Sequence, residues 1–269
     1  LIVIYCVDFG IISQNFTPDL LKNPIAAIYT PFSFILVYEV YLLIYYLPKS
    51  FTTYIGKQYE IITLIIIRRL FKDLSNLSFS QDWFELKNDM QFTYDLIASL
   101  LLFFLIYQFY VQSKKKYVDG VTEENELKEI GRFIKVKKIL ATLLVPVLIF
   151  VAIYSFLQWF LGTINSSTDG NISFKNINNI FFEQFFTILI VADVILLLFS
   201  FFHTDQFHKV IRNSGFIIST ILIRLSFATS GLLNTLLILS AIVFGLLILI
   251  IFNKFEKKIS EEKRRELIQ

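Results

Sequence analysis

Long hydrophobic runs follow one another along this chain and decide what it can fold into. A helix that crosses a membrane needs about 20 consecutive apolar residues. Several runs reach that length, and hydrophobic residues make up 55% of the 269 positions, against about 45–50% in soluble proteins. The sequence therefore predicts an all-α fold: a polytopic integral membrane helical bundle with about seven or eight transmembrane helices.

The runs leave no soluble domain of useful size, so we expect one transmembrane domain, residues 1–252, and a charged tail, residues 253–269. Leu1 lies within an apolar run, and we expect the first span to begin before the numbering does. Run lengths place the clear spans at approximately 1–13, 27–47, 92–111, 139–161, 180–202, 216–229 and 232–252.

Residues 51–75 are compatible with two interpretations. Their uncharged part, between Glu60 and Arg68, would give only about 10 Å of helix, whereas the hydrocarbon core is about 30 Å thick. The segment is either an amphipathic helix at the membrane interface or a further span, at about 55–72, whose charged ends are buried in the bundle.

Residues 216–252 are too long for a single span, because 37 residues would make a helix of about 55 Å. Ser230, Gly231 and Asn234 offer a break. We predict a short helix at 216–229 and a full one at 232–252.

The distribution of basic residues predicts the orientation. Residues 114–138 contain eight Lys or Arg and residues 254–269 contain six, while residues 163–180 contain only Lys175. The positive-inside rule then places the C-terminus and residues 114–138 in the cytoplasm. We expect a bacterial inner membrane or an organellar membrane.

Four ionisable residues interrupt the apolar runs: Asp8, Glu39, Asp193 and Arg224. A charge at the bilayer centre costs about 2.5–3.5 kcal/mol on insertion scales, and it usually persists by pairing or by facing water. These residues are the candidate ion or proton pathway, or else a buried charge network.

Glu39 lies within the expected span 27–47. It is either a carboxylate that binds a proton or a cation, or a structural acid paired with an arginine of another helix. Tyr38 and Tyr41 are close enough in sequence to supply hydroxyl groups, and Tyr45 could extend a polar stripe.

Arg224 cannot become neutral, so it needs an acceptor or must reach the membrane surface with its long side chain. Asp193 is the most plausible acceptor, because a short connection makes the two helices neighbours. Asp193 itself is then either a static partner or a protonatable relay.

Two further clusters have weaker functional interpretations. Arg68 and Arg69 are too few for a voltage sensor, which uses about 3–4 charges, and we expect them to contact lipid headgroups or to pair within the bundle. The segment His203–His208 is more typical of a solvated helix end than of a metal site.

The function that the sequence favours is a channel or transporter for protons or small ions. The alternative is a structural or accessory subunit of a membrane complex, in which the charges fix helix packing. We expect no enzyme activity, cofactor or metal, because nucleotide-binding, nucleophile-elbow and zinc-helix motifs are missing from the sequence. The expected partners are the lipid bilayer, a small ion and a second copy or another membrane subunit, but no nucleic acid.

Overall fold

The computed structural model describes residues 35, 38–74, 87–115, 124–165, 174–203, 206–229 and 231–266, and every regular element in these ranges is helical. A first helical segment covers residues 38–46. The longer helices are α3 (Phe51–Leu74), α4 (Lys87–Ser113), α5 (Glu124–Asn165), α6 (Phe174–His203), α7 (Phe207–Ser226) and α8 (Leu232–Glu266).

Four of these helices contain segments long and apolar enough to cross a membrane. They are Met90–Ser113, Gly131–Tyr154, Gln184–Phe202 and Leu232–Glu262. The predicted all-helical fold with several membrane-length helices is thereby confirmed at the level of these four. The predicted span 1–13 lies outside the described residues, as do residues 27–34, 36 and 37 of the predicted span 27–47.

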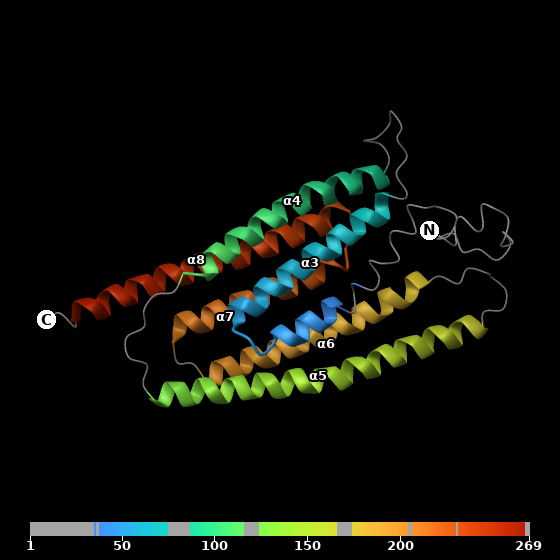
Figure 1. Cartoon of the computed structure of the whole chain (residues 1–269). Coiled ribbons are helices and arrows are strands. Elements are labelled where there is room, and N and C mark those ends of the chain that lie inside the picture. The colour runs from blue at the N-terminus through green and yellow to red at the C-terminus, as the bar shows by residue number, and fades with distance from the viewer. Residues whose placement is uncertain are drawn as a thin grey trace.

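The helices lie side by side along one direction, with α3 in the middle of the group (Figure 1). α3 packs against α4 and α7, while α8 packs against α4 and α7. α6 packs against both α7 and α5, and α5 forms the outer edge of the group of helices. Tyr59, Phe109 and Phe216 are completely buried where these helices meet.

Residues 51–74, whose position was left open above, form α3, which packs inside the described bundle. Its 24 residues extend over about 36 Å, and Ile55, Tyr59 and Ile66 are at most 1% exposed. The helix continues through Glu60 and Arg68, and both charges are paired. Glu60 forms an ion pair with Lys57, and Arg68 forms one with Glu39. This packing agrees with the interpretation as a further helix whose charged ends are buried in the bundle, and the position of α3 relative to a membrane stays a prediction.

The predicted break in residues 216–252 is confirmed between Ser226 and Leu232. Gly231 has φ +73°, a left-handed conformation that glycine adopts readily. The predicted helix lengths are wrong, because α7 begins at Phe207 and α8 continues to Glu266. Polar residues extend both helices by contacting one another, as His208 does with Glu256.

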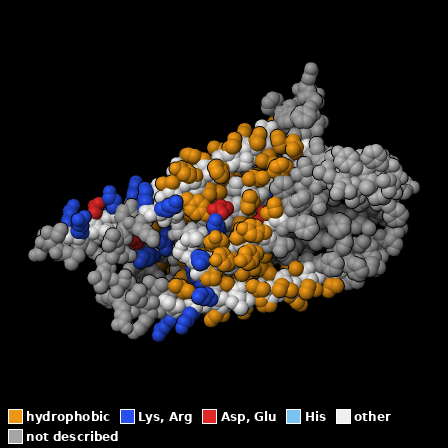
Figure 2. All heavy atoms as spheres, in the orientation of Figure 1, with side chains coloured by type: hydrophobic (Ala, Val, Ile, Leu, Met, Phe, Trp, Pro, Cys, Tyr) orange, Lys and Arg blue, Asp and Glu red, His pale blue; other side chains and the backbone are white. Residues whose placement is uncertain are grey.

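The surface of the bundle is divided by residue type. Figure 2 shows hydrophobic side chains over the middle of the visible face, and Lys and Arg side chains toward the end where α8 terminates. Phe103, Phe150 and Leu100 are 75%, 70% and 69% exposed. Large exposed apolar surfaces mark contact with a membrane or a partner rather than with water.

Candidate functional site

The first buried ion pair joins α6 to α7. Arg224 donates from Nη2 to Asp193 Oδ2 at 2.9 Å, and Asp193 is completely buried. Tyr54 of α3 donates its hydroxyl to Asp193 Oδ1 at 2.9 Å. The pairing expected from the sequence is present, and both oxygens of the acid are satisfied.

Gln58, one helical turn after Tyr54, bridges the two charges of this pair. Its Nε2 lies 3.4 Å from Asp193 Oδ2, and its Oε1 lies 3.4 Å from Arg224 Nη2. Three helices thus converge on one carboxylate. Because a buried charge is stabilised only when it is paired and hydrogen-bonded, this arrangement suits a permanent ion pair.

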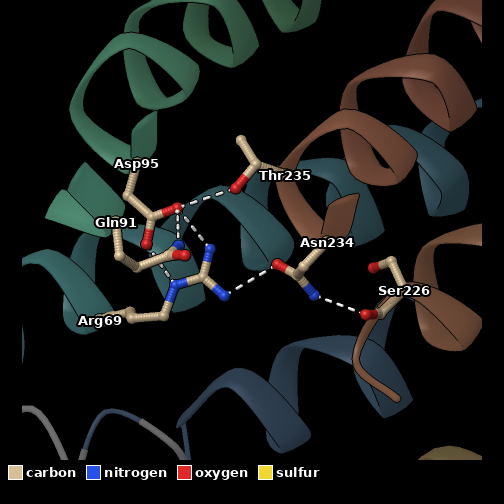
Figure 3. A network of polar contacts seen from close by, with 6 residues as sticks. All are labelled: Arg69, Gln91, Asp95, Ser226, Asn234 and Thr235. Atoms are coloured by element: carbon tan, nitrogen blue, oxygen red, sulfur yellow. Dashed lines mark hydrogen bonds and ion pairs between the residues drawn. The ribbon is translucent and has the colours of Figure 1, made fainter. Parts of the chain in front are cut away.

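A second buried acid, Asp95 of α4, is held by Arg69 of α3 (Figure 3). Arg69 uses both Nε and Nη2, the latter at 2.6 Å from Asp95 Oδ1. Gln91 and Thr235 each donate to Asp95 Oδ1 at 3.0 Å. A bidentate guanidinium contact of this kind fixes geometry as well as charge.

The same arginine connects α3 to the first turn of α8. Its Nη1 donates to Asn234 Oδ1 at 2.8 Å, and Asn234 Nδ2 donates to the carbonyl oxygen of Ser226 at 2.6 Å. Figure 3 shows these contacts as one continuous network. Asn234 therefore holds the end of α7, where a helix leaves carbonyl groups without intrahelical partners.

The third buried acid, Glu39, is held differently. Its Oε2 lies 3.9 Å from Nη1 of Arg68 on α3, and Glu39 is 2% exposed. Among the residues that the structure describes, neither carboxylate oxygen of Glu39 has a hydrogen-bond partner. Leaving a buried acceptor unsatisfied costs about 1–3 kcal/mol, so this carboxylate has unused capacity for a ligand.

The tyrosines next to Glu39 do not line the predicted polar stripe. Tyr38, Tyr41 and Tyr45 are 55%, 56% and 50% exposed, on the outside of the helical segment 38–46. Their rings stack in a row, with centroids 6.4 and 5.9 Å apart. The three tyrosines lie on an exposed face of the helical segment, whereas Glu39 lies on its buried face.

A partly exposed polar cluster lies nearer the start of α3. Glu60 forms an ion pair with Lys57 at 2.7 Å and accepts a hydrogen bond from Tyr110 of α4 at 2.5 Å. The Lys57 ammonium lies 5.2 Å from the ring centre of Tyr46. This cluster joins the segment 38–46 to α3 and α4.

The remaining predicted residues can be placed in part. Asp8 lies outside the described residues, as do Asp205 and the side chain of His203. His208, in the first turn of α7, contacts Glu256 at 2.8 Å. No group of three or more possible metal ligands occurs in the described part of the chain.

Several of these polar contacts involve residues that the sequence analysis does not single out. Asp95 lies inside the expected span 92–111, and the rule used for Glu39 could have found it. Tyr54 and Gln58 give no such signal, because tyrosine and glutamine are common in amphipathic helices. Arg68 and Arg69 pair within the bundle, which was one of their two expected roles.

Comparison with protein-family models, with curated protein sequences and with solved structures finds no match to this chain. The functional argument therefore depends on the geometry of the three buried acids.

Proposed function

We propose that this chain is a multi-pass membrane protein that translocates protons or small cations, with Glu39 as the group that binds the transported ion. The observation that carries this proposal is the contrast among three buried acids. Asp193 and Asp95 have hydrogen bonds to both oxygens. Glu39 has none among the described residues. A carboxyl group must have free lone pairs to accept a proton or a cation.

Arg68 supplies the second element of the proposed site. At 3.9 Å, its guanidinium lies close enough to Glu39 to interact through charge without a hydrogen bond. An arriving cation competes with Arg68 for the carboxylate, and its departure restores the pair. In this mechanism either Arg68 or the transported cation neutralises Glu39 at any one time. The competition with Arg68 allows the bound cation to leave.

The other two pairs hold the site in position. Asp193 with Arg224 connects α6 and α7 to Tyr54 of α3, and Arg69 of α3 connects to Asp95 of α4 and to the start of α8. We propose that α3, α7 and the segment 38–46 cross the membrane together with the four long apolar helices. The exposed apolar surface around the bundle supports this placement.

The test is a flux measurement on purified protein in sealed vesicles. With an imposed membrane potential and a trapped pH indicator, we expect wild-type vesicles to take up protons. Glu39→Gln should reduce the rate to that of protein-free vesicles. The matched control, Glu261→Gln, makes the same chemical change at a side chain 57% exposed and should leave the rate unchanged. Unaltered flux in Glu39→Gln would refute the assignment.

The same vesicles can distinguish a proton from a metal cation. If a proton is carried, the uptake should be the same with sodium, potassium or choline as the external cation. If sodium or potassium is carried, uptake of that isotope should depend on Glu39 while the internal pH stays constant.

A second candidate function is an accessory subunit of a membrane complex. The exposed row of Tyr38, Tyr41 and Tyr45 favours it, because aromatic side chains are enriched in protein interfaces. A stable partner recovered from native membranes, combined with no flux by the purified chain, would support this function over transport.

The proposed orientation places the C-terminus and the start of α5 in the cytoplasm. Reporter fusions after residues 125 and 269 should then report the cytoplasmic side, and a fusion after residue 170 the opposite side. An exported reporter at residue 125 would overturn this topology.

A further inference from the structure

A small open groove between α7 and α8 is lined mainly by apolar side chains, with Arg212 among its lining residues. It lies where α7 begins and where the apolar run of α8 gives way to charged residues. Ile211, Ile251 and Phe255 line it and are 44%, 50% and 52% exposed. Arg212 lines the same groove and lies one turn before the apolar part of α7.

Packing against an aromatic ring holds the Arg212 guanidinium in place. Its Cζ lies 4.3 Å from the ring centre of Phe252. Its Nε and Nη2 donate to Asn213 Oδ1 at 3.1 and 3.0 Å. Among described residues these are its only hydrogen bonds, so Nη1 donates to none of them.

The acid beside this arginine is already engaged. Glu256 Oε1 contacts His208 Nε2 at 2.8 Å, and the His208 ring stacks on Phe252 with centroids 5.7 Å apart. Arg212 keeps its positive charge at neutral pH, because a guanidinium stays protonated in proteins.

We propose that this groove binds an anionic phospholipid, with its phosphate on Arg212 and an acyl chain along Ile211 and Ile251. The change from apolar to charged residues along α8 places the groove at headgroup depth. Lys209 and Lys254, neighbours of the groove in sequence, add positive charge. Basic pockets between helices on the cytoplasmic side are suited to anionic headgroups.

This inference uses the membrane placement proposed above but not the transport activity. Lipid binding can be measured without flux, and reporter fusions test the placement separately. A failure of either claim is therefore distinguishable from a failure of the other.

The experiment is native mass spectrometry of the detergent-purified full chain with equal amounts of phosphatidylglycerol and phosphatidylcholine. We expect wild-type protein to retain phosphatidylglycerol preferentially. Arg212→Gln should weaken that binding about fivefold, the effect of one basic residue near a charged membrane surface. The matched control, Arg264→Gln, removes an exposed arginine near the end of α8 and should keep the preference.

Two further measurements identify the ligand and control for misfolding of Arg212→Gln. Ile251→Trp fills the apolar part of the groove with all charges intact and should also reduce phosphatidylglycerol binding. Millimolar inorganic phosphate should not displace the lipid; displacement would show a free-phosphate site and refute the proposal. Equal retention of both lipids by wild-type protein would also refute it, whether or not Arg212→Gln folds.

Discussion

The acids Asp193 and Glu39 are both buried, with 0% and 2% of their surface exposed, yet their surroundings differ. Asp193 receives donors from Tyr54 and Arg224, with Gln58 bridging acid and base. Glu39 faces a single arginine at 3.9 Å and receives no hydrogen bond from the described residues. Burial alone does not separate structural from functional charges. In the proposal made here, the number of hydrogen-bond donors around each acid separates them.

This comparison predicts opposite consequences of mutation. Removing a partner from a saturated pair should destabilise the fold, because an uncompensated charge is left behind. Removing the charge of Glu39 should instead affect activity while leaving the fold intact. The following predictions test that division, from the largest expected effect on stability to the smallest.

Breaking the pair between α6 and α7 should have the largest effect. Asp193→Leu or Arg224→Leu alone should each lower the free energy of unfolding by about 3–5 kcal/mol, and the double change should restore much of that loss. Denaturant unfolding in detergent measures both. Losses that simply add in the double variant would show that the two residues are not energetic partners.

The Asp95 network should be the next most sensitive. In Asp95→Leu, Asn234 is the remaining described hydrogen-bond acceptor of Arg69. The free energy of unfolding should fall by about 2–3 kcal/mol, as expected for the loss of hydrogen bonds to a charged group. Arg69 is 27% exposed, so water can partly solvate it and limit the loss. A change below about 0.5 kcal/mol would contradict a structural role.

Gly245 tests how closely α3 approaches α8. A Cβ at this position would lie 1.8 Å from the Tyr59 hydroxyl, which shares a 2.7 Å hydrogen bond with Ser219. Gly245→Ala should therefore cost about 1–3 kcal/mol through overpacking.

Tyr59→Phe provides the control, because it removes the clashing oxygen. In the Tyr59→Phe background, Gly245→Ala should cost measurably less in the same unfolding assay. An equal cost in both backgrounds would place the clash elsewhere.

Glu39→Gln should have the smallest effect on stability, below about 1 kcal/mol. Its shape is preserved, and the long contact with Arg68 contributes little compared with a hydrogen-bonded pair. Thermal unfolding of the variant used for flux measures this directly. A loss comparable to that of Asp193→Leu would place Glu39 among the structural acids.

The sequence predicted the parts of this molecule that depend on local composition. Run lengths located α4, α5, α6 and α8, and Gly231 marked the turn before α8. The limits of the helices were less predictable. α7 and α8 extend into polar sequence because His208 and Glu256 stabilise each other across the pair, a tertiary contact that run lengths do not contain.

The site was predictable only where a charge stood alone in an apolar run. This rule identified Glu39, Asp193 and Arg224, and the short connection between α6 and α7 suggested the right partner for Arg224. It missed the role of α3, whose polar residues resemble those of a surface helix. Only the packing of α3 among its neighbours shows that Gln58 and Arg68 point into the bundle.

The most direct test of the central claim is infrared difference spectroscopy of the carboxyl groups during a pH change. With isotope-labelled glutamate, wild-type protein should show a buried glutamic acid band that appears as the pH falls and is lost in Glu39→Gln. With labelled aspartate, no comparable reversible band should arise from Asp193, whose two oxygens accept hydrogen bonds from Tyr54 and Arg224. A reversible aspartic acid band that is lost in Asp193→Leu, with no band from Glu39, would contradict the account.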